Sequence, residues 1–154
     1  MRISLICVGK LGQTPEAVLA RDYVRRAGAT GRALGLAPVE IIEVEARRRG
    51  RSAEAEAILA QADEAILIAC DERGRTTTSA AFARRLAELR DQGARRLAFA
   101  IGGADGLDAS ALGRAAEQVS FGPQTWPHAL ARVMLAEQIY RAATILAGSP
   151  YHRP

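Results

Sequence analysis

The residues best suited to chemistry lie in three loops, each directly after a short apolar segment. The loops are residues 71–74, 102–108 and 121–128. Glycine lets a ligand approach the backbone closely, so Gly102 and Gly103 form either the floor of a cofactor site or a structural turn. The loop is neither a dinucleotide fingerprint nor a P-loop, because Ala104 breaks the first pattern and no Gly-Lys-Ser/Thr follows.

Five side chains near the end of the chain could act on a substrate. His128 and Arg132 lie one helical turn apart and share a helix face. His128 can accept a proton near neutral pH, or it can cap the helix. Arg132 can hold a phosphate or the carbonyl oxygens of a base, or it forms a structural ion pair. Tyr151, His152 and Arg153 can stack on an unpaired base and bind phosphate, unless this tail is a frayed end.

The pattern of apolar residues predicts alternating strands and helices around these loops. The predicted strands are residues 2–8, 39–44, 65–70, 97–101 and 119–121. The predicted helices are residues 14–27, 52–62, 78–93, 109–117 and 128–147. This alternation predicts an α/β fold, a mostly parallel sheet with helices on both faces, in one domain over residues 1–154. Such sheets bind ligands at the carboxyl ends of their strands, which brings the three loops together.

The charge of the chain favours a polyanionic partner. The 154 residues carry a net charge of +4, which suits nucleic acid. Lys10 is the only lysine, however, and an excess of arginine also arises from a GC-rich genome. Arg47, Arg48, Arg49 and Arg51 form a cluster in a predicted loop, which is either an RNA contact or a solvated loop.

The composition also indicates a compartment and excludes some classes of protein. The longest apolar runs are too short to cross a bilayer, and the first residues make a poor signal peptide. Cys7 and Cys70 are isolated within apolar runs, which suits a reducing cytoplasm. Two histidines and two cysteines at scattered positions do not form a zinc site, so no metal is expected.

An ordered set of motifs in the last third resembles the RlmH (YbeA) family of SPOUT-class methyltransferases. The motifs are Ile101-Gly102-Gly103-Ala104-Asp105-Gly106-Leu107, Ala116-Glu117-Gln118, Thr125-Trp126-Pro127-His128, Arg132, Glu137-Gln138-Ile139-Tyr140-Arg141-Ala142 and Pro150-Tyr151-His152-Arg153. The resemblance implies a Rossmann-like sheet whose C-terminal segment forms a trefoil knot, and a homodimer. It also implies transfer of a methyl group from S-adenosylmethionine (SAM) to N3 of a pseudouridine in 23S ribosomal RNA (rRNA), within the ribosome.

The resemblance also assigns the SAM contacts to the three loops. They are Cys70, Gly102, Gly103, Phe121, Gly122, Pro123, Gln124, Thr125 and Trp126. Two of these depart from the family's usual residues. Cys70 replaces a leucine but stays apolar, whereas Pro123 removes one backbone donor from its loop.

The chemistry that the resemblance implies does not require a strong base. An imide-type nitrogen must lose its proton to attack the methyl carbon, and positioning can supply much of the rate. The candidate catalytic residues are therefore His128, Arg132, Tyr151, His152 and Arg153. An alternative is an RNA-binding or ribosome-associated module of the same fold that has lost catalysis. A hydrolase has little support, because Ser120 lies outside any G-x-S-x-G motif.

Overall fold

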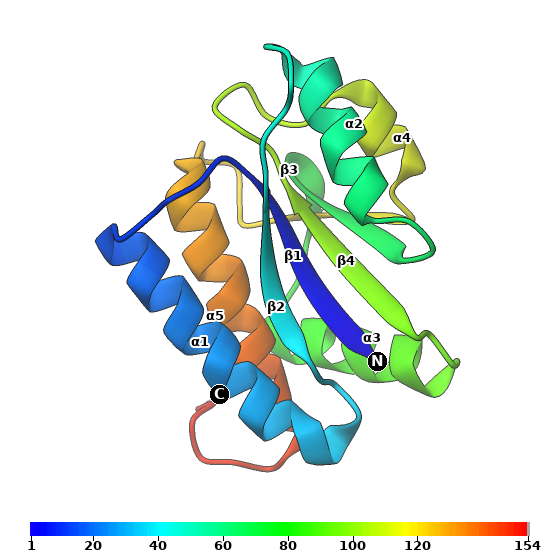
Figure 1. Ribbon diagram of the computed structural model, residues 1–154. Helices are drawn as coiled ribbons and strands as arrows, with labels where there is room; N and C mark the ends of the chain where they lie inside the picture. The colour runs from blue at the N-terminus through cyan, green and yellow to red at the C-terminus, as the bar shows by residue number, and fades with distance from the viewer. Residues whose placement is uncertain (154) are drawn as a thin grey trace.

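A parallel sheet forms the centre of the computed structural model, which describes residues 1–153 (Figure 1). Its five strands are β1 (Arg2–Val8), β2 (Val39–Val44), β3 (Ile66–Thr76), β4 (Arg96–Ile101) and β5 (Glu117–Ser120). They lie in the order β2-β1-β4-β3-β5, and each neighbouring pair is parallel. The predicted α/β class is therefore confirmed, and all strands direct their carboxyl ends to one edge of the sheet.

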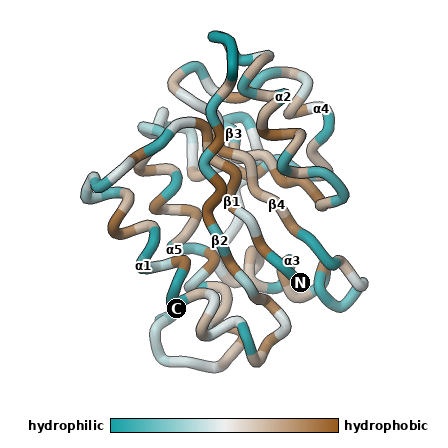
Figure 2. The backbone as a smooth tube through the Cα atoms, in the orientation of Figure 1, coloured by the Kyte–Doolittle hydropathy of each residue, from teal (hydrophilic) through white to brown (hydrophobic). Residues whose placement is uncertain are grey.

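Helices cover both faces of this sheet. The first face packs against α1 (Pro15–Gly31), α3 (Ser79–Asp91) and α5 (His128–Leu146). The second face packs against the shorter α2 (Arg51–Gln61) and α4 (Ala109–Arg114). A short 3-10 helix, Arg32–Leu34, follows α1. Because helices cover both faces, the strands are apolar along most of their length, as the hydropathy colouring shows (Figure 2).

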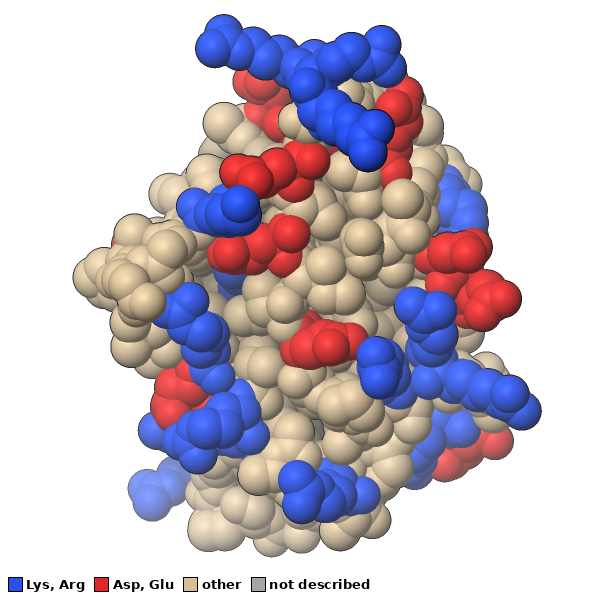
Figure 3. Space-filling model, viewed as in Figure 1, with Lys and Arg blue, Asp and Glu red and all other residues tan. Residues whose placement is uncertain are grey.

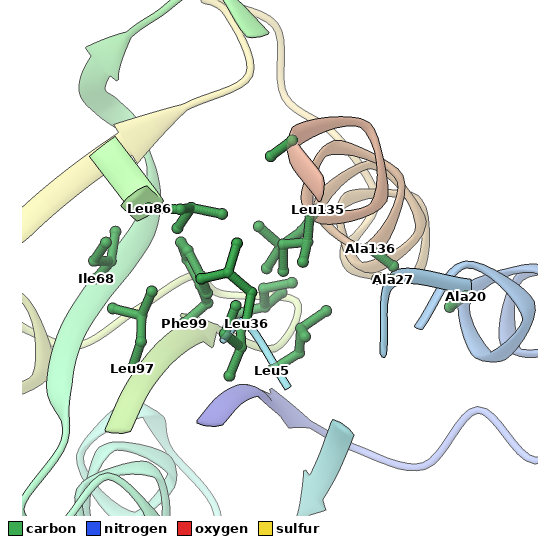
Figure 4. Packing of buried hydrophobic residues seen from close by; sticks show 14 of the residues in the cluster. Leu5, Ala20, Ala27, Leu36, Ile68, Leu86, Leu97, Phe99, Leu135 and Ala136 are labelled. Carbon is green, nitrogen blue, oxygen red and sulfur yellow. The ribbon is translucent and has the colours of Figure 1, made fainter. Parts of the chain in front are cut away.

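Alternate residues of each central strand enter different cores. Leu5 and Cys7 of β1 belong to the core beneath α1, α3 and α5, whereas Ile6 and Val8 belong to the core beneath α2 and α4. Phe99 of β4 lies at the centre of the first core, among the leucines that Figure 4 labels. This two-residue alternation fixes the register of the strands, because a shift by one residue would exchange the two cores.

The helix starts follow the residues that the sequence offers as caps. The Thr14 hydroxyl accepts a hydrogen bond from the Ala17 amide, and Pro15 occupies the first helical turn of α1. The Thr78 hydroxyl accepts one from the Ala81 amide at the start of α3. Both starts agree with the predicted ones.

Several predicted boundaries were wrong. The helix predicted over residues 109–117 ends at Arg114, and the strand predicted over residues 119–121 is Glu117–Ser120. Two further differences have a local cause. Residues 28–38 were predicted to be a loop, but α1 continues to Gly31, where the Leu36 amide donates back to the Gly31 carbonyl at 2.9 Å. Residues 71–74 were predicted to be a turn, but they belong to β3, which bulges between Cys70 and Arg75 and pairs again with β5. Gly74 permits this pairing, because a Cβ there would lie 2.7 Å from the Val119 backbone.

The apolar stripe of α5 packs inside the chain. Its members Leu135, Ile139 and Ala142 are buried in the first core, and Leu146 packs against that core. The stripe therefore belongs to the core of the chain. The trefoil knot stays a prediction. No helix among residues 1–153 is long and apolar enough to cross a membrane.

Candidate functional site

A cleft of about 500 Å³ opens at the carboxyl edge of the sheet. It lies between the bulge of β3 and the loops that follow β4 and β5, where ligands bind in such sheets. Most of the residues that the sequence assigned to SAM line it: Cys70, Gly102, Gly103, Phe121, Gly122, Gln124, Thr125 and Trp126. Pro123 was assigned to the same contacts, but it is exposed and is not among the residues that line the cleft.

The loop after β4 closes tightly on itself. Gly103 and Gly106 form an isolated bridge, in which the Gly106 amide donates to the Gly103 carbonyl at 3.1 Å. A Cβ at position 102 would lie only 2.6 Å from the carbonyl carbon of Gly106. The loop therefore requires glycine at position 102. The same loop forms one wall of the cleft.

Gly102→Ala is expected to lower the free energy of unfolding by about 1–3 kcal/mol, because the backbone of the loop must move aside. The same movement should weaken SAM binding about tenfold, as measured by calorimetry alongside urea unfolding. Gly113→Ala in α4 is the matched control, since a Cβ there meets nothing within 4 Å. The control should be neutral or stabilising by up to about 1 kcal/mol. Equal effects of both substitutions would contradict the packing role of Gly102.

Ser120 joins the loop after β5 to the bulge of β3. Its hydroxyl oxygen accepts from the Gly122 amide at 3.1 Å and lies 3.1 Å from the Glu72 carbonyl oxygen. Gly122 has a φ of 110°, which favours glycine. Sequence reasoning considered Ser120 only as a nucleophile, but the structure gives it a positioning role. The exposed Trp126, at 41% of its full accessibility, follows on the same rim.

The two thiols remain protonated at neutral pH. Burial raises the pKa of Cys7 to about 12 and also raises the pKa of Cys70 well above its usual value. Cys70 therefore acts as an apolar side chain in the cleft wall, as predicted for a residue that replaces leucine. A thiolate nucleophile is excluded at these two positions.

Charged residues line the rim of the cleft, and the sequence pointed to only some of them. Asp71, a predicted rim residue, accepts a hydrogen bond from the Arg73 amide at 3.0 Å. Asp108 caps α4, and its hydrogen bonds with Ser110 lower its pKa. Sequence reasoning missed the rim positions of Arg51 and Arg73. The sequence did contain a signal for these positions. Arg73 follows the apolar run of β3, and Arg51 begins α2.

His128 is the first residue of α5 and lines the cleft, half-buried. The predicted alternative for His128 was a cap. Pro127 occupies the cap position, and no side chain of residues 1–153 donates or accepts a capping hydrogen bond there. The position of His128 therefore favours contact with a ligand in the cleft over capping.

Arg132 lies away from the cleft, buried at 1% exposure. Its guanidinium donates to the Glu43 carboxylate at 2.6 Å and to the carbonyl oxygens of Val8 and Gly9 at 3.3 and 3.0 Å. Among the described residues its Nε has no partner. This geometry favours the predicted ion pair over the predicted phosphate contact, and it fastens the start of α5 to the ends of β1 and β2.

The tail folds back onto α5 and packs against the middle of the helix, away from its first residue at the cleft. Figure 1 shows the end of the chain beside α5. The Tyr151 hydroxyl lies 3.1 Å from a Glu137 carboxylate oxygen, and its ring centroid lies 4.7 Å from that of Tyr140. His152 Nδ1 lies 3.4 Å from an Arg141 nitrogen, whereas Arg153 is exposed. Glu137 and Arg141 also form the predicted helical ion pair, at 2.7 Å.

Tail and cleft are therefore separated within one chain. Glu137 lies nine positions after His128 along the helix, a rise of about 14 Å. The structure does not bring Tyr151, His152 or Arg153 to the residues that line the cleft. Within residues 1–153 there is also no group of three or more His, Cys, Asp or Glu side chains that suits a metal ion.

Comparisons with known proteins agree with this fold. Residues 1–152 match the family described as "Predicted SPOUT methyltransferase". Three proteins described as "Ribosomal RNA large subunit methyltransferase H" are similar over 99% of both chains: one from a Caulobacter species at 63% identity, one from Caulobacter vibrioides at 62% and one from Phenylobacterium zucineum at 60%.

Solved structures show the same fold at low sequence identity. A probable methylase family protein from Haemophilus influenzae has a TM-score of 0.55 at 12% identity, over 99% of this chain and 70% of that one. A probable methyltransferase from Bordetella pertussis has a TM-score of 0.53 at 14% identity, over 92% and 96%. The full-length identity of 60% or more with the three curated relatives shows the family. This chain belongs to the RlmH family of SPOUT methyltransferases.

Proposed function

We propose that this protein transfers the methyl group of SAM to N3 of a pseudouridine in 23S rRNA, on the assembled ribosome and as a homodimer. The observation that carries the proposal is the 60–63% identity, over 99% of both chains, with relatives described as large-subunit rRNA methyltransferases. The cleft supports it, since its walls are the three loops that the family resemblance assigns to the cofactor.

The residues of the cleft suit SAM. Phe121, Leu107 and Val119 supply apolar surface for a purine ring, and the adjoining backbone supplies polar groups. The volume of about 500 Å³ lies within the range of small-molecule sites, roughly 300–1,000 Å³. When bound, SAM supplies a methyl group on a positively charged sulfur, which a nitrogen nucleophile can attack in line.

The chain's own residues would position the nucleotide and handle its proton. His128 lines the cleft, and its imidazole would be the group that accepts the N3 proton. Arg153 is exposed at the end of a tail that Tyr151 anchors, so its guanidinium is available to a phosphate. Arg132 holds the start of α5, and with it His128, against the sheet.

A homodimer would bring the tail of one chain to the cleft of the other. Within one chain, the tail and the cleft are separated by about half the length of α5, because Tyr151 packs against Glu137. Beside α5, the α1 face carries the exposed Val18 and Leu19, at 54% and 45% of full accessibility. An apolar groove of about 510 Å³ runs from Leu19 to Phe121, along α1, α5 and β5. A second copy on this face would bury that surface and complete the site.

The test is a methyl-transfer assay with labelled SAM on RNA from cells that lack the gene. We expect labelling of the large-subunit rRNA in whole ribosomes, weak labelling of free rRNA and none of transfer RNA. Labelling of transfer RNA but not of ribosomes would overturn the substrate while leaving the methyltransferase class intact. Calorimetry separates the alternative of an inactive RNA-binding module, which would give no heat with SAM.

A further inference from the structure

The loop between β2 and α2 concentrates unneutralised positive charge. Arg47, Arg48, Arg49 and Arg51, which we call the basic loop, are all exposed. Within the described residues the loop forms one ion pair, Arg48 with Glu56 at 3.8 Å, whose side chains are 79% and 68% exposed. An ion pair so open to water contributes little, and it leaves the charge of the loop available to a partner.

Several arginines elsewhere in the chain are paired with carboxylates. Asp22 pairs with both Arg25 and Arg26, each at 2.7 Å. Arg90 pairs with Asp91 at 2.7 Å. An arginine-rich composition does not by itself explain why four arginines gather within five positions, three of them without an ion pair among the described residues and the fourth with only the exposed Glu56. The basic loop is therefore distinct from the ordinary charged surface of this protein.

The basic loop lies at the rim of the candidate site. Arg51 and Asp108 both line the cleft. The pKa of Asp108 is lowered mainly by its hydrogen bonds with Ser110 and, to a smaller extent, by the positive charge of Arg51. Arg73 lines the cleft from the bulge of β3. Figure 3 shows arginine side chains projecting from the end of the molecule where the β2–α2 loop lies in Figure 1.

We propose that the basic loop binds the phosphates of the rRNA strand next to the target nucleotide, with Arg51 nearest the cleft. This rests on the proposed function, because it needs RNA at the cleft. Guanidinium groups bind phosphate oxygens through planar, paired donors, and they do so without reading bases. The loop therefore sets affinity and orientation, while the cleft and tail select the nucleotide.

The test compares two triple variants with the same loss of charge. Arg47→Gln/Arg48→Gln/Arg49→Gln alters the basic loop and spares Arg51. The control, Arg84→Gln/Arg95→Gln/Arg96→Gln, alters exposed residues of α3 and of the amino-terminal edge of β4. Methyl transfer to whole ribosomes from cells lacking the gene is measured over a series of KCl concentrations, with SAM affinity and thermal unfolding measured in parallel.

The loop variant is expected to raise the KM for the ribosomal substrate about 10- to 100-fold, with little change in kcat. Loss of three phosphate contacts should reduce the slope of log(kcat/KM) against log[KCl] by about 2, at about 0.7 per single-strand contact. SAM affinity and thermal unfolding should not change, and the control should stay within about twofold of the original protein. Equal effects in both variants, or no effect in the loop variant, would overturn the proposal.

A binding measurement separates this proposal from the proposed function. If the unaltered protein fails to methylate the large-subunit rRNA of whole ribosomes, the proposed function fails, and anisotropy titration of labelled large-subunit rRNA fragments then tests the loop by itself. Weaker binding by the loop variant than by the control supports an RNA-binding loop. Equal binding by the two variants contradicts it.

Discussion

Removal of residues 151–154 should abolish methyl transfer while leaving SAM affinity unchanged. The described part of this tail, residues 151–153, packs on α5 and does not line the cleft, and Pro154 lies outside the described residues. The deletion removes an aromatic ring and a guanidinium that suit a nucleotide. One base stack contributes about 1–3 kcal/mol, so with the phosphate contact we expect a loss of about 100-fold or more. The measurement pairs the transfer assay with SAM calorimetry.

Single substitutions in the tail distinguish the loss of a substrate contact from a purely structural effect of the deletion. Tyr151→Phe removes the contact with Glu137 but keeps the ring packed on Tyr140, whereas Arg153→Ala removes only an exposed side chain. Arg153→Ala should lower transfer at least tenfold without altering thermal unfolding. Lost SAM affinity in the deletion, with the fold intact, would show that the tail belongs to the cofactor site of its own chain.

Mixing two inactive chains tests whether tail and cleft come from different subunits. One partner lacks residues 151–154, and the other carries Gly102→Ala, at a SAM concentration where its homodimer is inactive. A mixed dimer then holds one intact cleft on the first chain and one intact tail on the second. Recovered transfer after subunit exchange is the expected result, and no recovery would place tail and cleft of one chain in the same site.

Arg132→Met is expected to lower the free energy of unfolding by about 3 kcal/mol, as measured by urea denaturation at fixed protein concentration. The substitution leaves Glu43 without its charged partner and the carbonyls of Val8 and Gly9 without a donor. Breaking a buried pair costs about 3–5 kcal/mol, and the 29% exposure of the Glu43 side chain places this case at the lower end.

A double-mutant cycle checks the cause of that loss. Glu43→Gln alone should also destabilise, because Arg132 is buried at 1% exposure and keeps its charge. The double variant should cost less than the two single changes together, with a coupling of about 1–3 kcal/mol. Purely additive effects would contradict the ion pair as the reason for burying Arg132.

The strands could be predicted well because their signal is local. The runs 2–8 and 39–44 match β1 and β2 at both ends, since apolar residues covered on both faces begin and stop abruptly. The end of α1 and the extension of β3 could not be predicted. Both depend on contacts distant in sequence, namely the turn back to Gly31 and the pairing of Gly74 with Val119.

The cleft could be predicted from the sequence more readily than the roles of single side chains. Glycines after strand ends indicate a ligand site whatever the rest of the fold does. The burial of Arg132 depends on Glu43, a carboxylate of β2 more than eighty residues away in the sequence. Because β2 carries a second carboxylate, Glu40, the sequence alone did not single out Glu43 as the partner. The packing of Tyr151 on Tyr140 likewise depends on how the tail folds back along α5.

Nucleoside analysis of the product tests the central claim most directly. Ribosomes from cells that lack the gene are incubated with the protein and SAM, and their large-subunit rRNA is digested and analysed by mass spectrometry. The account predicts one new methyl group, on N3 of a pseudouridine, which is absent when SAM is omitted. A methyl group on a ribose, on an unmodified base or on no nucleoside of the large subunit would contradict it.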